Sequence, residues 1–281
     1  MKITVTPESF KLAQVFTISR GSRTEAKVLT VRLQDGENHG WGECVPYARY
    51  DETLESVTAE VNGLPDRFDR AELYELLPAG AARNAVDCAL WDMEAKACGK
   101  RAWELAGLPA PKPEITAYTL SLDTPAKMQE QAAKHAFRPL LKIKLGTPDD
   151  MPRLEAVRAG APKSRIIIDA NEGWSRAVYL DLVPHLQRLG VSLVEQPLPA
   201  SDDEGLIGIE RPVPVCADES AHDCSSLPYL KGKYDVVNIK LDKTGGLTEA
   251  LALRAAARAA GFDVMVGCMV GSSLAMAPAV L

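Results

Sequence analysis

The chain has 281 residues, of which 46% are hydrophobic and 25% are charged, and its formal net charge is −6. This composition is that of an ordinary globular protein, and the length suits one large α/β domain with a smaller companion. The acidic balance and the lack of a basic cluster argue against nucleic acid or an anionic membrane as partner, so a small molecule is expected.

The six cysteines show neither the spacing of metal ligands nor the density of a disulfide framework, so we expect reduced thiols. The N-terminus alternates like a strand and lacks the apolar core of a signal peptide. No apolar run reaches the length that spans a membrane. The expected location is therefore the cytoplasm.

The first part of the chain is predicted to begin as a β-sheet. A turn cluster at residues 34–40 separates the later strands, and the strand-like runs are residues 10–18, 26–33 and 41–45. The polar stretch 19–23, which contains Arg20 and Arg23, is interpreted as a flexible loop. These two arginines matter for function only if that loop closes over a site.

Helices are expected to follow these strands. The predicted helices, the last of them rich in alanine and closed by a glycine, cover residues 51–61, 70–77 and 80–99. The run 107–113 contains three prolines and breaks the pattern. We place a domain boundary there, which divides the chain into residues 1–112 and 113–281.

Beyond this boundary, short apolar strands alternate with amphipathic helices such as 125–135 and 247–260. The predicted strands are residues 115–122, 140–145, 165–170, 191–195, 213–217, 235–241 and 263–268. Strands that are apolar on both faces indicate βα repeats and a parallel sheet. No Gly-x-Gly-x-x-Gly follows the first strand, so a TIM-type barrel is favoured over an open dinucleotide-binding sheet. Only seven strands are counted, and no eighth strand is expected within this chain.

Polar and charged side chains stand at the carboxyl ends of five consecutive predicted strands. They are Lys142, Lys144, Asp169, Asn171, Glu195, Gln196, Asp218, Glu219, Lys240 and Asp242. Active-site residues of TIM barrels gather at these strand ends, so the side chains are expected to converge. Such a series is difficult to explain by solvation alone and indicates a functional site.

The charges in this series assign the chemistry. Three converging carboxylates, Asp169, Glu195 and Asp218, would repel one another unless a cation neutralised them, and all-oxygen ligands select Mg²⁺. Lys144 and Lys240 are then expected on opposite flanks of the metal. Lys142 leaves the strand on the same face as Lys144 and should lower the pKa of its neighbour towards that of a general base.

A site of this kind is suited to substrates that carry a carboxylate. It would remove the proton from the adjacent α-carbon while the metal stabilises the resulting charge. Two bases on opposite faces allow removal from one side and return on the other. The predicted outcome is epimerisation.

The strand-end motifs resemble the enolase superfamily, muconate-lactonising subgroup. They are Lys142-Ile143-Lys144, Asp169-Ala170-Asn171-Glu172, Glu195-Gln196-Pro197, Ala217-Asp218-Glu219-Ser220 and Asn238 to Gly246. Within the subgroup the chain is most similar to dipeptide epimerases. That similarity is carried by residues 19–23, 42–47, 78–84 and 267–269.

The resemblance implies a (β/α)7β barrel, with residues 1–112 as an α+β capping domain whose early loop covers the barrel mouth. The eighth strand and a C-terminal cap segment are absent from this chain. It also implies Mg²⁺-dependent epimerisation of L-Ala-D/L-Glu type dipeptides of the cell wall, by 1,1-proton transfer through a metal-stabilised enediolate. Arg20, with Arg23 second, would pair with the substrate's glutamate side chain. Cys268 either lines the pocket or is a buried structural thiol.

Two alternatives stay open at this point. The same proton abstraction serves cycloisomerases and o-succinylbenzoate synthase-like dehydratases of the subgroup. A truncated non-catalytic derivative is the other reading, because the Asp-x-Asp that holds the substrate's amino group in this family does not occur after Cys268. The expected partners are a small dipeptide and, as an option, further copies of the chain.

Overall fold

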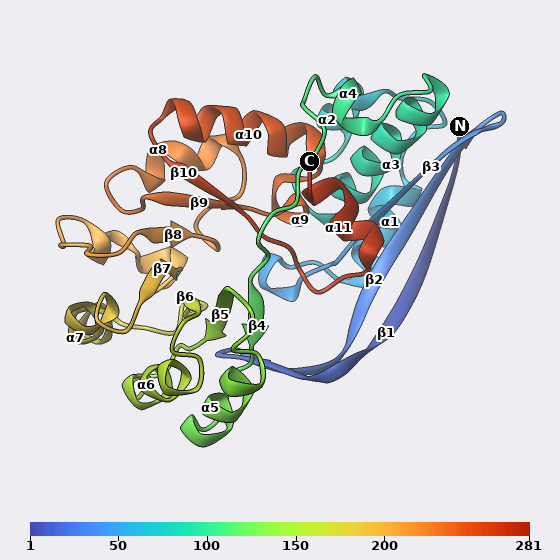
Figure 1. The fold of residues 1–281 in the computed structure, drawn as a ribbon. Coiled ribbons are helices and arrows are strands. Elements are labelled where there is room, and N and C mark those ends of the chain that lie inside the picture. Colours follow the sequence, from blue (N-terminus) through green and yellow to red (C-terminus); the bar gives the residue numbers. More distant parts are fainter.

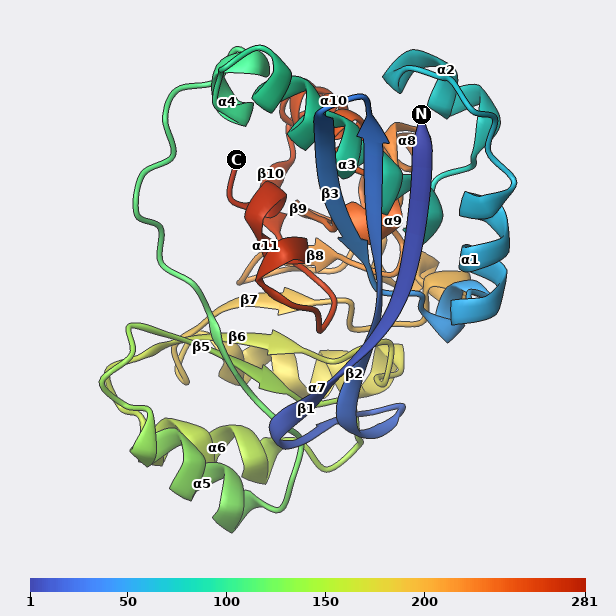
Figure 2. The same ribbon diagram turned by 90° about the vertical axis from the view of Figure 1, so that its right-hand side faces the viewer.

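The computed structural model describes residues 1–281. Its N-terminal sheet is antiparallel and consists of β1 (Lys2–Ile18), β2 (Gly21–Asp35) and β3 (Asn38–Cys44), in that order. The strands β1 and β2 form a long hairpin that reaches from the small domain to the parallel sheet (Figure 2). The prediction of a flexible loop at residues 19–23 is wrong, since pairing continues to Ile18 and Gly21. The turn is confined to Ser19 and Arg20, and Arg23 belongs to β2.

Four helices complete the small domain: α1 (Leu54–Asn62), α2 (Arg70–Leu76), α3 (Ala81–Ala97) and α4 (Ala102–Leu105). The helix α1 begins where the Thr53 side chain accepts a hydrogen bond from the Ser56 N–H. The alanines of α3 allow close contact with β3, where a Cβ on Gly42 would lie 2.0 Å from the carbonyl oxygen of Ala85. Glycine is therefore required in β3 at this contact.

The large domain is built on a parallel sheet of seven strands. In spatial order these are β10 (Asp263–Val266), β9 (Val236–Ile239), β8 (Val215–Ala217), β7 (Val191–Glu195), β6 (Arg165–Asp169), β5 (Leu140–Lys144) and β4 (Tyr118–Leu120). Each strand pairs with its neighbour in the sequence, and the sheet curves as part of a barrel (Figure 1). The predicted fold class is confirmed, with β4 and β10 as the two edges.

Helices pack around this sheet and follow most of its strands. They are α5 (Pro125–Lys134), α6 (Met151–Gly160), α7 (Arg176–Leu186), α8 (Leu227–Leu230), α9 (Leu241–Thr244), α10 (Leu247–Ala259) and α11 (Ser273–Ala279). The regular alternation is interrupted between β7 and β8, where only short 3-10 turns at 200–202 and 204–206 occur. Pro197 and Pro199 restrict the backbone just before these turns.

The small domain contacts the large domain mainly through α3. The buried Arg83 donates hydrogen bonds to the carbonyl oxygens of Thr244 (2.8 Å) and Gly245 (3.2 Å), and the Trp91 indole donates to Thr248 (2.8 Å). Residues 108–117 form a connection without regular secondary structure, and the predicted boundary at 112/113 falls inside it. No helix combines the length and apolar character needed to cross a bilayer.

Candidate active site

Three carboxylates meet at the carboxyl ends of neighbouring strands. Asp169 ends β6, Glu195 ends β7 and Asp218 follows β8 directly. All three side chains are buried, and one oxygen atom of each lies within 4.8 Å of the others. The strand register brings them together, because Asp169 pairs with both Lys144 and Glu195 across the sheet.

The two lysines of β5 contact this triad from one side. Lys142 places its Nζ 2.9 Å from Asp169 Oδ2 and 2.5 Å from Glu195 Oε2. Lys144 Nζ lies 2.6 Å from Asp169 Oδ2 and 3.0 Å from Asn171 Oδ1. Burial lowers the pKa of Lys144, and the charge of Lys142 lowers it further, while Asp169 opposes both effects. Lys144 is therefore easier to deprotonate than an ordinary lysine.

Two further lysines contact the triad from the other side. Lys240 Nζ lies 2.5 Å from Asp218 Oδ2, and Lys243 Nζ lies 2.8 Å from Asp218 Oδ1. Burial lowers the pKa of Lys240, but Asp218 and Glu195 outweigh burial and raise it above its ordinary value. Lys243 is fully buried and also donates to the carbonyl oxygen of Asn238. Sequence reasoning missed its contact with Asp218, although it lies three residues from Lys240.

The donor set fits a hard divalent cation. Burial and the nearby Asp169 raise the pKa of Glu195, whereas lysines lower those of Asp169 and Asp218 despite burial. Glu195 Oε2 is buried and its charged partner is Lys142 Nζ at 2.5 Å, so a lone pair of this oxygen is left for a cation. The possible metal ligands that converge here are all carboxylate oxygens, which favours Mg²⁺ over metals that prefer histidine or cysteine.

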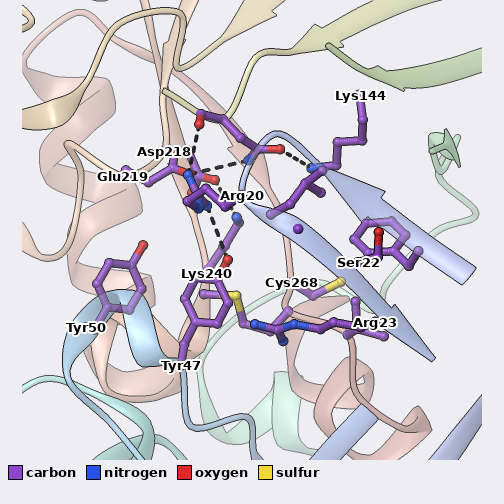
Figure 3. Close-up of a pocket in the computed structure, with 16 residues that line it drawn as sticks. Arg20, Ser22, Arg23, Tyr47, Tyr50, Lys144, Asp218, Glu219, Lys240 and Cys268 are labelled. Carbon is purple, nitrogen blue, oxygen red and sulfur yellow. Dashed lines mark hydrogen bonds and ion pairs between the residues drawn. The ribbon is translucent and has the colours of Figure 1, made fainter. Parts of the chain in front are cut away.

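A pocket of about 180 Å³ opens beside the triad (Figure 3). Its walls come from the β1–β2 hairpin, the loop after β3, the strand ends and the segment after β10. They include Phe16, Ile18, Arg20, Arg23, Tyr47, Tyr50, Lys144, Asn171, Asp218, Glu219, Lys240, Cys268 and Met269. Lys144 and Lys240 both reach this pocket, and each is paired with a different carboxylate.

The two arginines of the hairpin differ in their partners. Arg20 NH2 donates to Glu219 Oε1 (2.8 Å) and Tyr47 (3.2 Å), and NH1 donates to the carbonyl oxygen of Asn171 (2.9 Å). Arg23 makes no ion pair, and its guanidinium lies 5.0 Å from the centre of the Tyr47 ring. Both arginines line the pocket (Figure 3), but Arg20 uses NH1 and NH2 in four hydrogen bonds to the protein, whereas the Arg23 guanidinium donates none.

The remaining predicted residues divide between the pocket and other places. Asn171 and Glu219 line the pocket, and burial with the charges of Asp218 and Asp169 raises the pKa of Glu219 to about 7. Cys268 has an exposed thiol at the pocket wall, so it is not a buried structural residue.

The structure does not bring Asp242 into the site. Its Oδ1 accepts from the Val45 N–H (3.0 Å) and from Asn84 (2.8 Å) at the domain contact, because the chain turns into α9 after Lys240.

Sequence reasoning missed the aromatic and acidic residues that the small domain and the loops bring to the rim. Tyr50 lies in a short 3-10 turn, and Tyr47 directly precedes that turn. Their rings pack edge to face, with 5.6 Å between the ring centres. Glu172 and Arg49 form an ion pair of 2.9 Å between the domains. Glu172 stands in the Asp169 to Glu172 motif and offered a signal. Tyr47 ends the stretch 42–47 that carries the family resemblance, whereas Tyr50 and Arg49 offered no signal, because only the tertiary fold places them.

Comparison with known proteins identifies the family. Residues 124–280 match the model described as enolase C-terminal domain-like, and residues 1–107 match the mandelate racemase / muconate lactonizing enzyme N-terminal domain. L-Ala-D/L-Glu epimerase of Escherichia coli (strain K12) is 45% identical, over 99% of this chain and 88% of its own length. N-acetyl-D-glutamate racemase of Pseudoalteromonas sp is 49% identical, over 90% of this chain and 82% of its own length.

Solved structures agree with these relatives. An enolase family member from Agrobacterium tumefaciens with homology to dipeptide epimerases, bound to sodium and L-Ala-L-Glu, has a TM-score of 0.96 and 54% identity, over 99% of this chain and 86% of that one. The dipeptide epimerase from Enterococcus faecalis V583, complexed with Mg and L-Leu-L-Tyr, has a TM-score of 0.91 and 28% identity, over 99% and 85%. The chain belongs to the mandelate racemase / muconate lactonizing enzyme family of the enolase superfamily.

Proposed function

We propose that this protein is a Mg²⁺-dependent dipeptide epimerase that inverts the α-carbon of the glutamate residue in L-Ala-Glu. The observation that carries the proposal is the pair of lysines in one pocket, Lys144 at Asp169 and Lys240 at Asp218, on two sides of a carboxylate triad. Relatives with this activity and dipeptide complexes of similar structures support it.

In the proposed reaction the two lysines exchange roles. One lysine, as a neutral amine, takes the α-proton, and the ammonium group of the other returns a proton to the opposite face. Mg²⁺ held by Asp169, Glu195 and Asp218 would supply positive charge for the substrate carboxylate and for the negative charge that develops as the proton leaves. Lys142 holds Asp169 and Glu195 in place and helps to keep the pKa of Lys144 low.

Substrate selection is assigned to the hairpin. An unpaired guanidinium on the pocket wall suits the second carboxylate of glutamate, and Arg23 has that property. Arg20 already donates to Glu219 and Tyr47, so we give it the second place for this role. This ordering reverses the one expected from the sequence.

A second candidate is racemisation of N-acetylglutamate, which the relative from Pseudoalteromonas favours. Both compounds are N-acylated glutamates with a free α-carboxylate, so the same lysines and Arg23 would serve either. They differ at the acyl end, where only the dipeptide carries an ammonium group.

Incubation in D₂O tests the proposal directly. L-Ala-L-Glu with Mg²⁺ should acquire deuterium at the glutamate α-carbon and yield L-Ala-D-Glu, as followed by proton NMR. Lys144→Ala and Lys240→Ala should each lower interconversion by at least about 10²-fold, the usual contribution of a positioned acid or base. Absence of exchange with the dipeptide would falsify the epimerase assignment, and exchange with N-acetylglutamate alone would select the second candidate.

The partners and location follow from the same features. The six free thiols favour a reducing compartment, and we propose the cytoplasm. The acidic net charge makes nucleic acid and anionic membranes unfavourable partners. We propose that residues 1–112 form the capping domain. Association between copies of the chain is a further option.

A further inference from the structure

Glu172 connects the two domains at the pocket rim. It follows Asn171 in the loop after β6, and its side chain contacts Arg49 of the small domain. The β1–β2 turn contributes Arg20 to this contact, and the 3-10 turn at Ala48–Tyr50 contributes Arg49. Two separate segments of the small domain therefore meet on one carboxylate.

The Glu172 carboxylate accepts hydrogen bonds from three residues. Arg49 binds both oxygens, with Nε 2.9 Å from Oε2 and NH2 2.9 Å from Oε1. Arg20 NH1 lies 3.2 Å from Oε2, and the Ala200 N–H donates to Oε1 at 2.8 Å. A two-pronged arginine pair has defined geometry, so it fixes orientation as well as distance.

The backbone around Glu172 is held in an uncommon conformation. Asn171 (φ 45°) and Glu172 (φ 66°) both occupy the left-handed region, which side chains with a Cβ rarely adopt. Hydrogen bonds from the Glu172 N–H to Gln196 and from the Trp174 N–H to Pro197 hold the loop. A Cβ on Gly173 would lie 2.3 Å from the Gly146 carbonyl oxygen, so the loop packs against the Gly146 backbone at a distance that only glycine allows. The strained backbone thus presents the Asn171 carbonyl and the Glu172 carboxylate to the small domain.

The surroundings distinguish this pair from ordinary surface ion pairs. The Glu172 side chain is 10% exposed and that of Arg49 is 38% exposed, whereas both partners of the Glu155–Arg188 pair are more than half exposed. Burial raises the pKa of Glu172, but the hydrogen bonds from Arg49 and Ala200 outweigh burial and hold the pKa below its ordinary value. Glu172 is therefore ionised at neutral pH and available to both arginines.

We propose that Glu172 and Arg49 are positioning residues that latch the small domain over the pocket. Through Arg20, the same latch sets Glu219 and the Asn171 carbonyl at the pocket wall. A loosened latch would leave the lysines and the triad intact but would weaken substrate binding. The inference rests on the proposed epimerase activity only for its kinetic test.

The experiment compares Glu172→Gln, Arg49→Gln and the double variant of the full chain, with Glu155→Gln as the matched control. Each single latch variant should raise KM for L-Ala-L-Glu about tenfold and change kcat by less than about threefold. The double variant should be no worse than the more impaired of the two singles, because each single variant already removes the Glu172–Arg49 pair. Glu155→Gln should leave KM unchanged.

Limited trypsin digestion without substrate supplies a readout that does not need activity. Cleavage after Arg20 or Arg23, identified by mass, should be several-fold faster in both latch variants than in the control. Unchanged KM and unchanged cleavage in Glu172→Gln, or losses that multiply in the double variant, would overturn the latch. If the unaltered protein shows no exchange with the dipeptide, the proposed function fails, and the digestion still decides on the latch.

Discussion

Arg20 and Arg23 illustrate how identical side chains three residues apart acquire different uses. The turn directs Arg20 to Glu219 and Glu172, where its charge is already balanced. Arg23 lies in β2 against the Tyr47 ring and has no anionic partner. A guanidinium whose donors are engaged must first lose those bonds to bind a ligand, whereas a free one does not.

We therefore expect Arg23→Gln to affect substrate choice. It should lower kcat/KM for L-Ala-L-Glu by about 10²-fold, the scale of one lost charge-assisted pair, and leave L-Ala-L-Leu within about threefold. Arg20→Gln should lower both activities, because it releases Glu219 at the pocket wall. Competition between the two dipeptides measures the ratio directly. An equal loss on both dipeptides in Arg23→Gln would contradict the assignment.

The charged residues at strand ends could be predicted from the sequence because parallel strands place their carboxyl ends at one edge. Asp169, Glu195 and Asp218 lie together for that reason. Asp242 was expected in the site but lies outside it, because the chain enters α9 directly after Lys240 and no sequence pattern marks that turn. Arg49 and Tyr50 could not be found, since their approach to the barrel depends on how the two domains dock.

The helices α3 and α9 form the main contact between the two domains. This contact contains a buried carboxyl group, that of Asp242. Asp242 accepts hydrogen bonds from Val45 and Asn84 and is 6% exposed. Burial raises the pKa of Asp242 to about 7, although these hydrogen bonds act against the rise. No lysine or arginine forms an ion pair with it, so its negative charge is unfavourable at this contact.

This carboxyl should make folding stability depend on pH. The folded chain holds the proton up to about pH 7, whereas the unfolded chain releases it near pH 4. The stability contribution is therefore largest below about pH 4 and falls as the pH rises from 4 to 7. Relative to the unaltered protein, Asp242→Asn should gain about 2 kcal/mol in free energy of unfolding between pH 5 and pH 8.

Urea unfolding at the two pH values measures that gain. Glu155→Gln, a surface acid on α6, serves as control and should differ from the unaltered protein by less than about 0.5 kcal/mol at both. A constant difference between Asp242→Asn and the unaltered protein across the pH range would show that the carboxyl stays ionised at the contact.

The overall architecture of the molecule could be predicted from the sequence more completely than the contacts between its two domains. The βα spacing indicated the curved parallel sheet, because strands buried on both faces have few other solutions. The length of the β1–β2 hairpin was underestimated, since β1 is mostly exposed and lacks a continuous apolar pattern. Its tip reaches the barrel mouth only in the folded chain, where Ser19 donates to the Asn171 carbonyl (3.0 Å).

Metal binding should couple the site to the stability of the whole fold. The triad joins three strands, and its geometry exists only in the folded state, so Mg²⁺ should bind the folded chain and not the unfolded one. At a concentration 100-fold above Kd, the gain is about 2.7 kcal/mol, and Tm should rise with Mg²⁺ and return to its original value with EDTA. Asp169→Asn removes one ligand and should abolish the increment, whatever its own Tm. Calorimetry with and without Mg²⁺ measures the increase in Tm for the unaltered protein and for Asp169→Asn. An equal increment in Asp169→Asn would place the stabilising ion outside the triad.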